Sequence, residues 1–226
     1  MSENRITLAL SKHVQDNFWL YIISLFCICT GIVIGIYSVK YMGSFERSDL
    51  VSYLNNFSST LKDGSINYQL IFIQTLKNNL PLILILWFLG LTMIGLPAIL
   101  LLDLFKGFTL GFTMSFIISQ LGTKGMWLSL IGIFPQNLIY IPAVVISSVI
   151  AMEFSITILK DRSEKKWTSN IWVRITSYSF MFILISSFMF LGFFMESYLS
   201  PNIVKLLMSN IGAWHKYYFV GDVAYV

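Results

Sequence analysis

The segment from Pro135 to Pro142 holds the residues most able to do chemistry in an otherwise apolar region. Two prolines in one helix free backbone carbonyls, and Gln136 and Asn137 add side-chain amides beside them. A transporter can use such a broken helix as its substrate site, whereas a structural bundle can use the same groups to hydrogen-bond neighbouring helices. Because no charged residue lies beside the break, we expect a structural lock made of Pro135, Gln136, Asn137 and Pro142.

Asp103 and Lys106 are the charged residues closest to the apolar runs. In one interpretation they belong to an ion path through the membrane. In the other they form an interfacial salt bridge that closes the hairpin between two membrane helices at headgroup level. We expect this hairpin ion pair. Without an unpaired ionisable group at mid-membrane, transport is the weaker of the two functions.

Enzymatic motifs are not found in the sequence. It has no His-Glu-x-x-His, no Gly-x-Ser-x-Gly and no Walker loop. Cys27 and Cys29 lie inside the first apolar run, and His13 and His215 are far from each other and from both cysteines. Zinc sites need more Cys or His at ligand spacing. We therefore expect no catalytic residues, no cofactor and no metal site, and a protein that is not an enzyme.

The elements that must position these residues are membrane helices. Of 226 residues, 56% are hydrophobic and 12% are charged, and a helix needs about 20 mainly apolar residues to cross the hydrocarbon layer. We predict an all-α, polytopic helical membrane protein, a single integral membrane domain over 1–226 with about five transmembrane helices. The expected spans are 18–39, 80–102, 107–123, 126–152 and 175–195.

Two segments are expected outside the bilayer, an outer loop over 40–79 and an outer C-terminal tail over 197–226. The loop should form an amphipathic helix, because apolar residues recur on one helical face. Nothing within the loop would bury this face, so we expect it to dock a partner or to rest on lipid or on the bundle. Its residues are Leu50, Leu54, Phe57 and Leu61.

Orientation follows from the densest basic cluster, which lies between the fourth and fifth spans. Lysine and arginine favour the cytoplasmic side, and four crossings place this cluster on the side of the N-terminus. We expect a cytoplasmic N-terminus and an extracytoplasmic C-terminus. The cluster consists of Lys160, Arg162, Lys165, Lys166 and Arg174.

Small residues and net charge bear on partners. Gly31 with Gly35, and Gly107 with Gly111, are spaced to let helices approach closely, either within the chain or between copies, so a homo-oligomer stays open. The formal charge of +4 is spread between apolar runs and forms no basic patch with exposed aromatics. Membrane lipids, and no nucleic acid, are therefore the expected partners.

Several spaced motifs resemble those of the stage II sporulation protein M family, in the same order along most of the chain. The resemblance ends at about Met208. The motifs are His13-Val14-Gln15, Asp63-Gly64, Gly95-Leu96-Pro97-Ala98, Lys106-Gly107-Phe108, Gly111-Phe112-Thr113, the run from Pro135 to Ala143, and Ser200-Pro201.

The resemblance implies a multi-pass protein of the bacterial cell membrane, located at the sporulation septum and the engulfing membrane. Its expected role is a non-enzymatic scaffold that anchors and recruits two peptidoglycan hydrolases, stage II sporulation proteins D and P. These enzymes remodel the septal wall while the membrane migrates during engulfment. The alternative from the residues is a channel or transporter subunit with its substrate site at the Pro135 to Pro142 break.

Overall fold

The protein is a bundle of long helices. The computed structural model describes residues 11–52, 68–163, 171–199 and 201–202, and all regular elements within these ranges are helical. Five helices are long and apolar enough to cross a membrane, which confirms the predicted all-α polytopic class. They comprise α2 (Phe18–Lys40), α4 (Tyr68–Gly90), α5 (Gly95–Leu121), the run from α6 (Thr123–Leu128) through a π-helical turn η1 (Ser129–Ile133) into α7 (Phe134–Ser163), and α8 (Ile171–Phe194), which continues into a second π-helical turn, η2 (Met195–Leu199).

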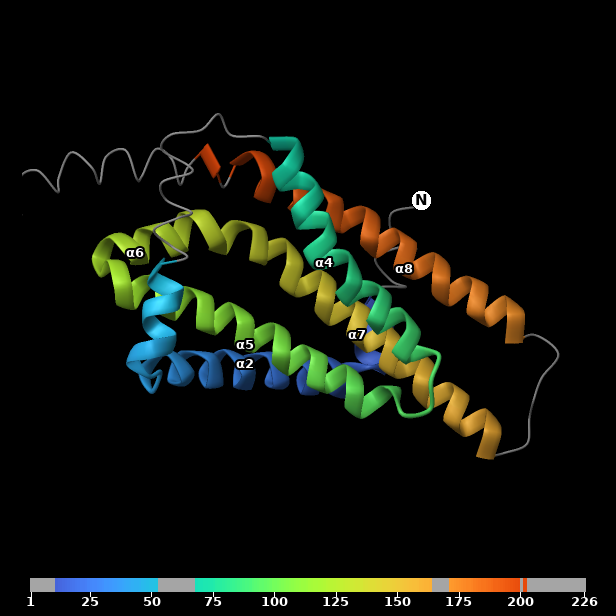
Figure 1. The fold of residues 1–226 in the computed structure, drawn as a ribbon. Helices are drawn as coiled ribbons and strands as arrows, with labels where there is room; N and C mark the ends of the chain where they lie inside the picture. The colour runs from blue at the N-terminus through green and yellow to red at the C-terminus, as the bar shows by residue number, and fades with distance from the viewer. Residues whose placement is uncertain (1–10, 53–67, 164–170, 200, 203–226) are drawn as a thin grey trace, which may run out of the picture.

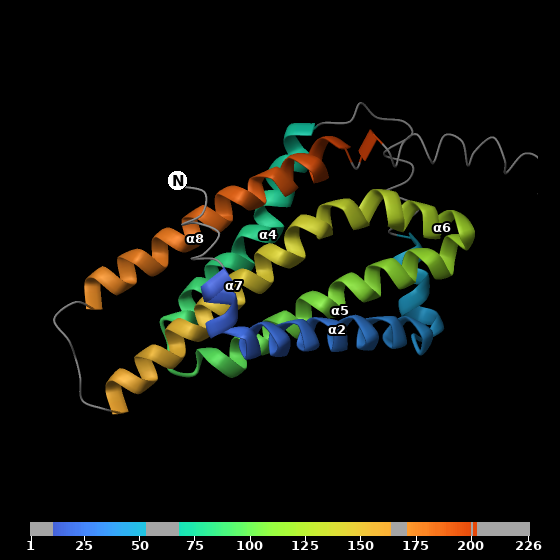
Figure 2. The ribbon, with the colours of Figure 1, turned by 180° about the vertical axis from the view of Figure 1, so that it is seen from behind.

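The helix α7 forms the centre of the bundle and lies between α4 and α5 in both views (Figures 1 and 2). In the most apolar window of the α6 to α7 run, 56% of residues are buried, against 17% to 28% in the other four spans. Outward-facing side chains elsewhere are large and apolar, as expected of a surface solvated by lipid. Examples are Phe26, Phe88, Leu101 and Ile183.

The helices α2 and α5 pack backbone to backbone through their glycines. A methyl group added to Gly31 would overlap the backbone of Leu104, and one added to Gly107 would overlap the backbone of Ile28. Gly35 and Gly111 are equally close to the opposite helix, one turn further along both helices. Gly31 lies against Leu104 and Gly35 lies against Phe108, so residue numbers rise together along both helices. The helices α2 and α5 therefore run parallel. The two glycine pairs therefore face each other within one chain.

The boundary between the second and third membrane helices differs from the prediction. The expected spans 80–102 and 107–123 placed a turn at Asp103, but α4 ends at Gly90 and α5 begins at Gly95. Hydrogen bonds close the turn here, from Leu91 N–H to Phe88 O and from Thr92 N–H to Leu89 O.

Prolines explain part of this difference. Pro97 lies in the first turn of α5, where its missing N–H leaves no bond unmade. Pro81, the second residue of the expected span 80–102, lies well inside α4. The charged residues at 103 and 106 therefore do not mark a helix end.

Successive crossings alternate in direction. Figure 1 shows the turn between α4 and α5 at the same end of the bundle as the C-terminal end of α7 and the start of α8, with α6 at the other end. Among the described residues, an ion pair at the first end joins Arg174 of α8 to Asp161 of α7. At the same end, His13 Nδ1 lies 3.5 Å from the Glu153 carboxylate.

Candidate functional site

Asp103 lies inside α5, about 12 Å along the helix axis from Gly95. Its carboxylate is fully buried and accepts two short hydrogen bonds. Ser24 of α2 donates to Oδ2 and Ser148 of α7 donates to Oδ1, each at 2.6 Å. Both serines are also fully buried. One carboxylate thus joins three helices in the interior of the bundle.

The predicted hairpin ion pair between Asp103 and Lys106 is therefore wrong. The turn between α4 and α5 lies between Gly90 and Gly95. Asp103 and Lys106 each bind side chains of other helices. The Lys106 ammonium donates to Asn79 Oδ1 of α4 at 3.4 Å and lies 5.6 Å from the ring centre of Tyr140 in α7. Two serine hydroxyls supply the hydrogen bonds of Asp103, so it needs no cation as a partner. The i, i+3 spacing of Asp103 and Lys106 therefore wrongly suggested an ion pair between them.

The predicted lock at the proline break is built differently from what we expected. The π-helical turn η1 immediately precedes Pro135, and such a turn accommodates a residue that cannot complete the regular bonding ladder. The Asn137 amide donates to Ile133 O at 2.8 Å, within its own chain segment. Pro142 is exposed. The interhelical bond expected of Asn137 is thus replaced by a local one.

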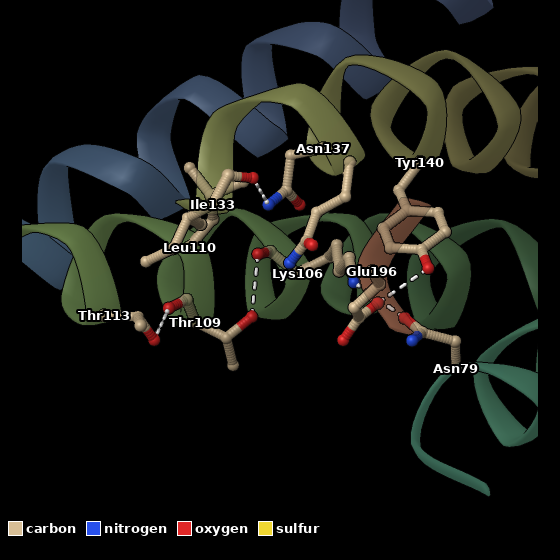
Figure 3. Close-up of a pocket in the computed structure, with 10 residues that line it drawn as sticks. Asn79, Lys106, Thr109, Leu110, Thr113, Ile133, Asn137, Tyr140 and Glu196 are labelled. Atoms are coloured by element: carbon tan, nitrogen blue, oxygen red, sulfur yellow. Dashed lines mark hydrogen bonds between the residues drawn. The ribbon is translucent and has the colours of Figure 1, made fainter. Parts of the chain in front are cut away.

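The break nevertheless lines a polar pocket of 220 Å³ between α4, α5, α7 and η2 (Figure 3). Glu196 of η2 reaches this pocket, and the Tyr140 hydroxyl donates to its Oε2 at 2.7 Å. In the sequence, Glu196 directly follows the expected span 175–195, and nothing there links it to the break. The lining residues are Asn79, Lys106, Thr109, Leu110, Thr113, Ile133, Gln136, Asn137, Tyr140 and Glu196.

Four functional candidates were missed from the sequence: Ser24, Ser148, Asn79 and Glu196. A hydroxyl or amide inside an apolar run is a weak signal, because serine can bond to its own helix, as Ser147 does to Ala143 O. Only the packing of α2, α5 and α7 shows that Ser24 and Ser148 point at one carboxylate. Asn79 contacts Lys106 only when α4 packs on α5. Glu196 contacts Tyr140 only when η2, which follows α8, packs on α7.

The predicted docking face falls mostly outside the described residues. Residues 44–52 are helical, and Leu50 within them is half-buried. Leu54, Phe57 and Leu61 lie outside the described residues. Docking by this face therefore stays a prediction.

Five helices are long and apolar enough to span a membrane. Asp103 joins three of them, α2, α5 and α7, and paired glycines join α2 to α5. These features define a polytopic helical membrane protein. The family model for stage II sporulation protein M matches residues 24–201. The chain belongs to that family, and it is a sporulation-related membrane protein. No curated protein and no solved structure matches the chain.

Proposed function

We propose that the protein is a non-enzymatic membrane scaffold that recruits peptidoglycan hydrolases, stage II sporulation proteins D and P, during engulfment. Membership of the stage II sporulation protein M family carries this proposal. The architecture supports it, because Asp103, the most deeply buried charge among the described residues, has both oxygens bonded by serines. That carboxylate holds helices together and is not directed at a substrate. The scaffold would act at the septum and the engulfing membrane.

The orientation we propose places the N-terminus in the cytoplasm. Support comes from Lys160 and Arg162 at the end of α7 and Arg174 near the start of α8, which lie at the same end of the bundle as the start of α2. Lysine and arginine in short loops favour the cytoplasmic side. The outer loop predicted over 40–79 is shorter than expected, because residues 68–79 belong to α4. In this orientation its remaining part, 41–67, and the C-terminal tail face the hydrolases outside.

Cysteine labelling tests this orientation. In a chain with Cys27 and Cys29 replaced by Ser, an impermeant thiol reagent added to intact cells should label a cysteine placed at Ser59. It should not label one placed at Ser163 until the cells are opened. Labelling at Ser163 in intact cells would reverse the proposed orientation.

The outer loop is the surface that we propose for docking. Replacing Leu54 and Phe57 with Ser should reduce the hydrolase recovered with the protein from sporulating cells, because an apolar docking face would be lost. Membrane insertion should persist, since both residues lie outside the spanning helices found in the described part of the chain. A matched control replaces Ser58 and Ser59 with Ala. Equal hydrolase recovery from both variants would remove the loop from the proposed interface.

Transport is the second candidate, and one observation now favours it more than the sequence did. We expected no ionisable group at mid-membrane, but Lys106 lies inside α5 and lines a pocket together with the Pro135 break. Charged residues within spanning helices frequently mark a path for solute or protons. Against transport, Asp103, the other charge inside α5, is bonded by Ser24 and Ser148 and does not line the pocket. The scaffold therefore remains the proposal.

A further inference from the structure

Two opposite charges line the same polar pocket without pairing. Lys106 of α5 and Glu196 of η2 both face the space shown in Figure 3. Both residues are described by the structure, yet they form no direct ion pair with each other, unlike Arg174 and Asp161. The negative charge of Glu196 attracts Lys106, yet the two groups do not close into a direct ion pair, which leaves both charges partly uncompensated inside the bundle. The pocket therefore has room and charge for a third partner.

Both charged groups have bonding capacity to spare. An ammonium carries three N–H donors, and that of Lys106 has one hydrogen bond among the described residues, a long one of 3.4 Å to Asn79. Glu196 receives the Tyr140 hydroxyl on Oε2, which leaves Oε1 able to accept. A ligand anion can therefore bind Lys106 while a ligand ammonium binds Glu196.

The other lining residues favour a primary ammonium over a quaternary ammonium as the cationic group of the ligand. Thr109 and Thr113 line the pocket and donate their hydroxyl protons to carbonyls of their own helix, so their oxygens remain available only as acceptors. A primary ammonium supplies the N–H donors that such acceptors need. Proteins commonly recognise a quaternary ammonium with a cage of several aromatic rings, and the one aromatic ring in the lining, Tyr140, already lies beside Lys106.

Size sets a further limit. The pocket has a volume of 220 Å³, below the roughly 300 to 1,000 Å³ of sites for drug-sized ligands. It can hold an amino acid or a headgroup, and it cannot enclose a sugar chain or a folded peptide.

We propose that this pocket binds a small zwitterion, with a carboxylate or phosphate on Lys106 and a primary ammonium on Glu196. The same chemistry occurs in a free amino acid and in the headgroup of an ethanolamine phospholipid. The proposal does not depend on hydrolase recruitment, so either one can fail alone.

The first test uses the unaltered protein, stripped of lipid in detergent, with calorimetric titration of three soluble probes. Phosphoethanolamine and β-alanine supply the primary ammonium, and phosphocholine lacks it. The second test reconstitutes the protein into nanodiscs that contain equal phosphatidylethanolamine and phosphatidylcholine, and measures the retained lipid by native mass spectrometry. Selective binding of the soluble primary amines supports a free zwitterion. Selective retention of phosphatidylethanolamine supports the lipid headgroup. Absence of selectivity for the primary ammonium in both tests overturns the proposal.

Variants assign the two ends of the ligand. Lys106→Met and Glu196→Gln should each weaken phosphoethanolamine or phosphatidylethanolamine binding roughly tenfold, the effect of losing one charge-assisted hydrogen bond. Glu196→Gln keeps an acceptor for Tyr140 and should also abolish the preference over the choline compound. Controls are Lys77→Met and Glu46→Gln, at exposed positions. Wild-type affinity and selectivity in folded Lys106→Met and Glu196→Gln proteins would also overturn the proposal.

Discussion

Replacing Asp103 with Ala should destabilise the bundle by about 3 kcal/mol, since two buried hydrogen bonds to a charged group contribute about 1.5 kcal/mol each or more. Ser24 and Ser148 would lose the acceptor that they share. Asp103→Asn should be less harmful, because an amide can accept from one serine and donate to the other. The measurement is equilibrium unfolding of the purified protein in mixed micelles, with Asp49→Ala, at an exposed position, as the control.

Two neighbouring serines distinguish the loss of the bond to Asp103 from the loss of any buried hydroxyl. Ser147 and Ser148 are adjacent and both fully buried, but Ser147 donates to Ala143 O of its own helix and Ser148 donates to Asp103. Ser148→Ala should therefore lower stability clearly more than Ser147→Ala. Equal stabilities for these two variants, together with an Asp103→Ala protein as stable as Asp49→Ala, would contradict the three-helix junction.

Adding a methyl group to Gly107 should destabilise the protein, although the same change normally stabilises a helix by about 1 kcal/mol. The new Cβ would lie closer than 3.0 Å to backbone atoms of Ile28, which cannot rotate away as a side chain can. Overpacking of this kind costs about 1 to 3 kcal/mol. Gly107→Ala should therefore lose stability, and Gly107→Val should fail to accumulate in the membrane.

Gly43 provides the control for this prediction. A methyl group there would meet only the carboxylate end of the flexible Glu46 side chain, so Gly43→Ala should be close to neutral. Unfolding in micelles and protein abundance in membranes are the two readouts. A Gly107→Ala protein more stable than the parent would mean that α2 and α5 do not pack backbone to backbone.

The sequence predicted the class of fold because hydropathy reports the membrane directly. Runs of about 20 apolar residues are sufficient to predict spanning helices, and five such helices are present. It could not predict where the second helix ends, because Asp103 and Lys106 seemed to interrupt an apolar run. A buried charge is tolerated when other helices supply its partners, and Ser24, Ser148 and Asn79 become partners only in the folded bundle.

The sequence predicted one part of the candidate site, the proline break, and did not predict that Glu196 joins it. The proline break stood out, since proline and amides are unusual at membrane depth, and the structure places Gln136 and Asn137 in the lining of the polar pocket. Glu196 lies far from the break in the sequence and meets it through Tyr140. The glycine spacing indicated close packing but could not choose between a neighbouring helix and a second copy. The structure shows α2 against α5.

The most direct test of the proposed function is purification of the unaltered protein from sporulating cells, with identification of the proteins that accompany it. The scaffold predicts that stage II sporulation proteins D and P are enriched relative to a parallel purification of an unrelated polytopic membrane protein. Enrichment of soluble nucleotide-binding subunits, with neither hydrolase present, would contradict the scaffold and favour a transporter.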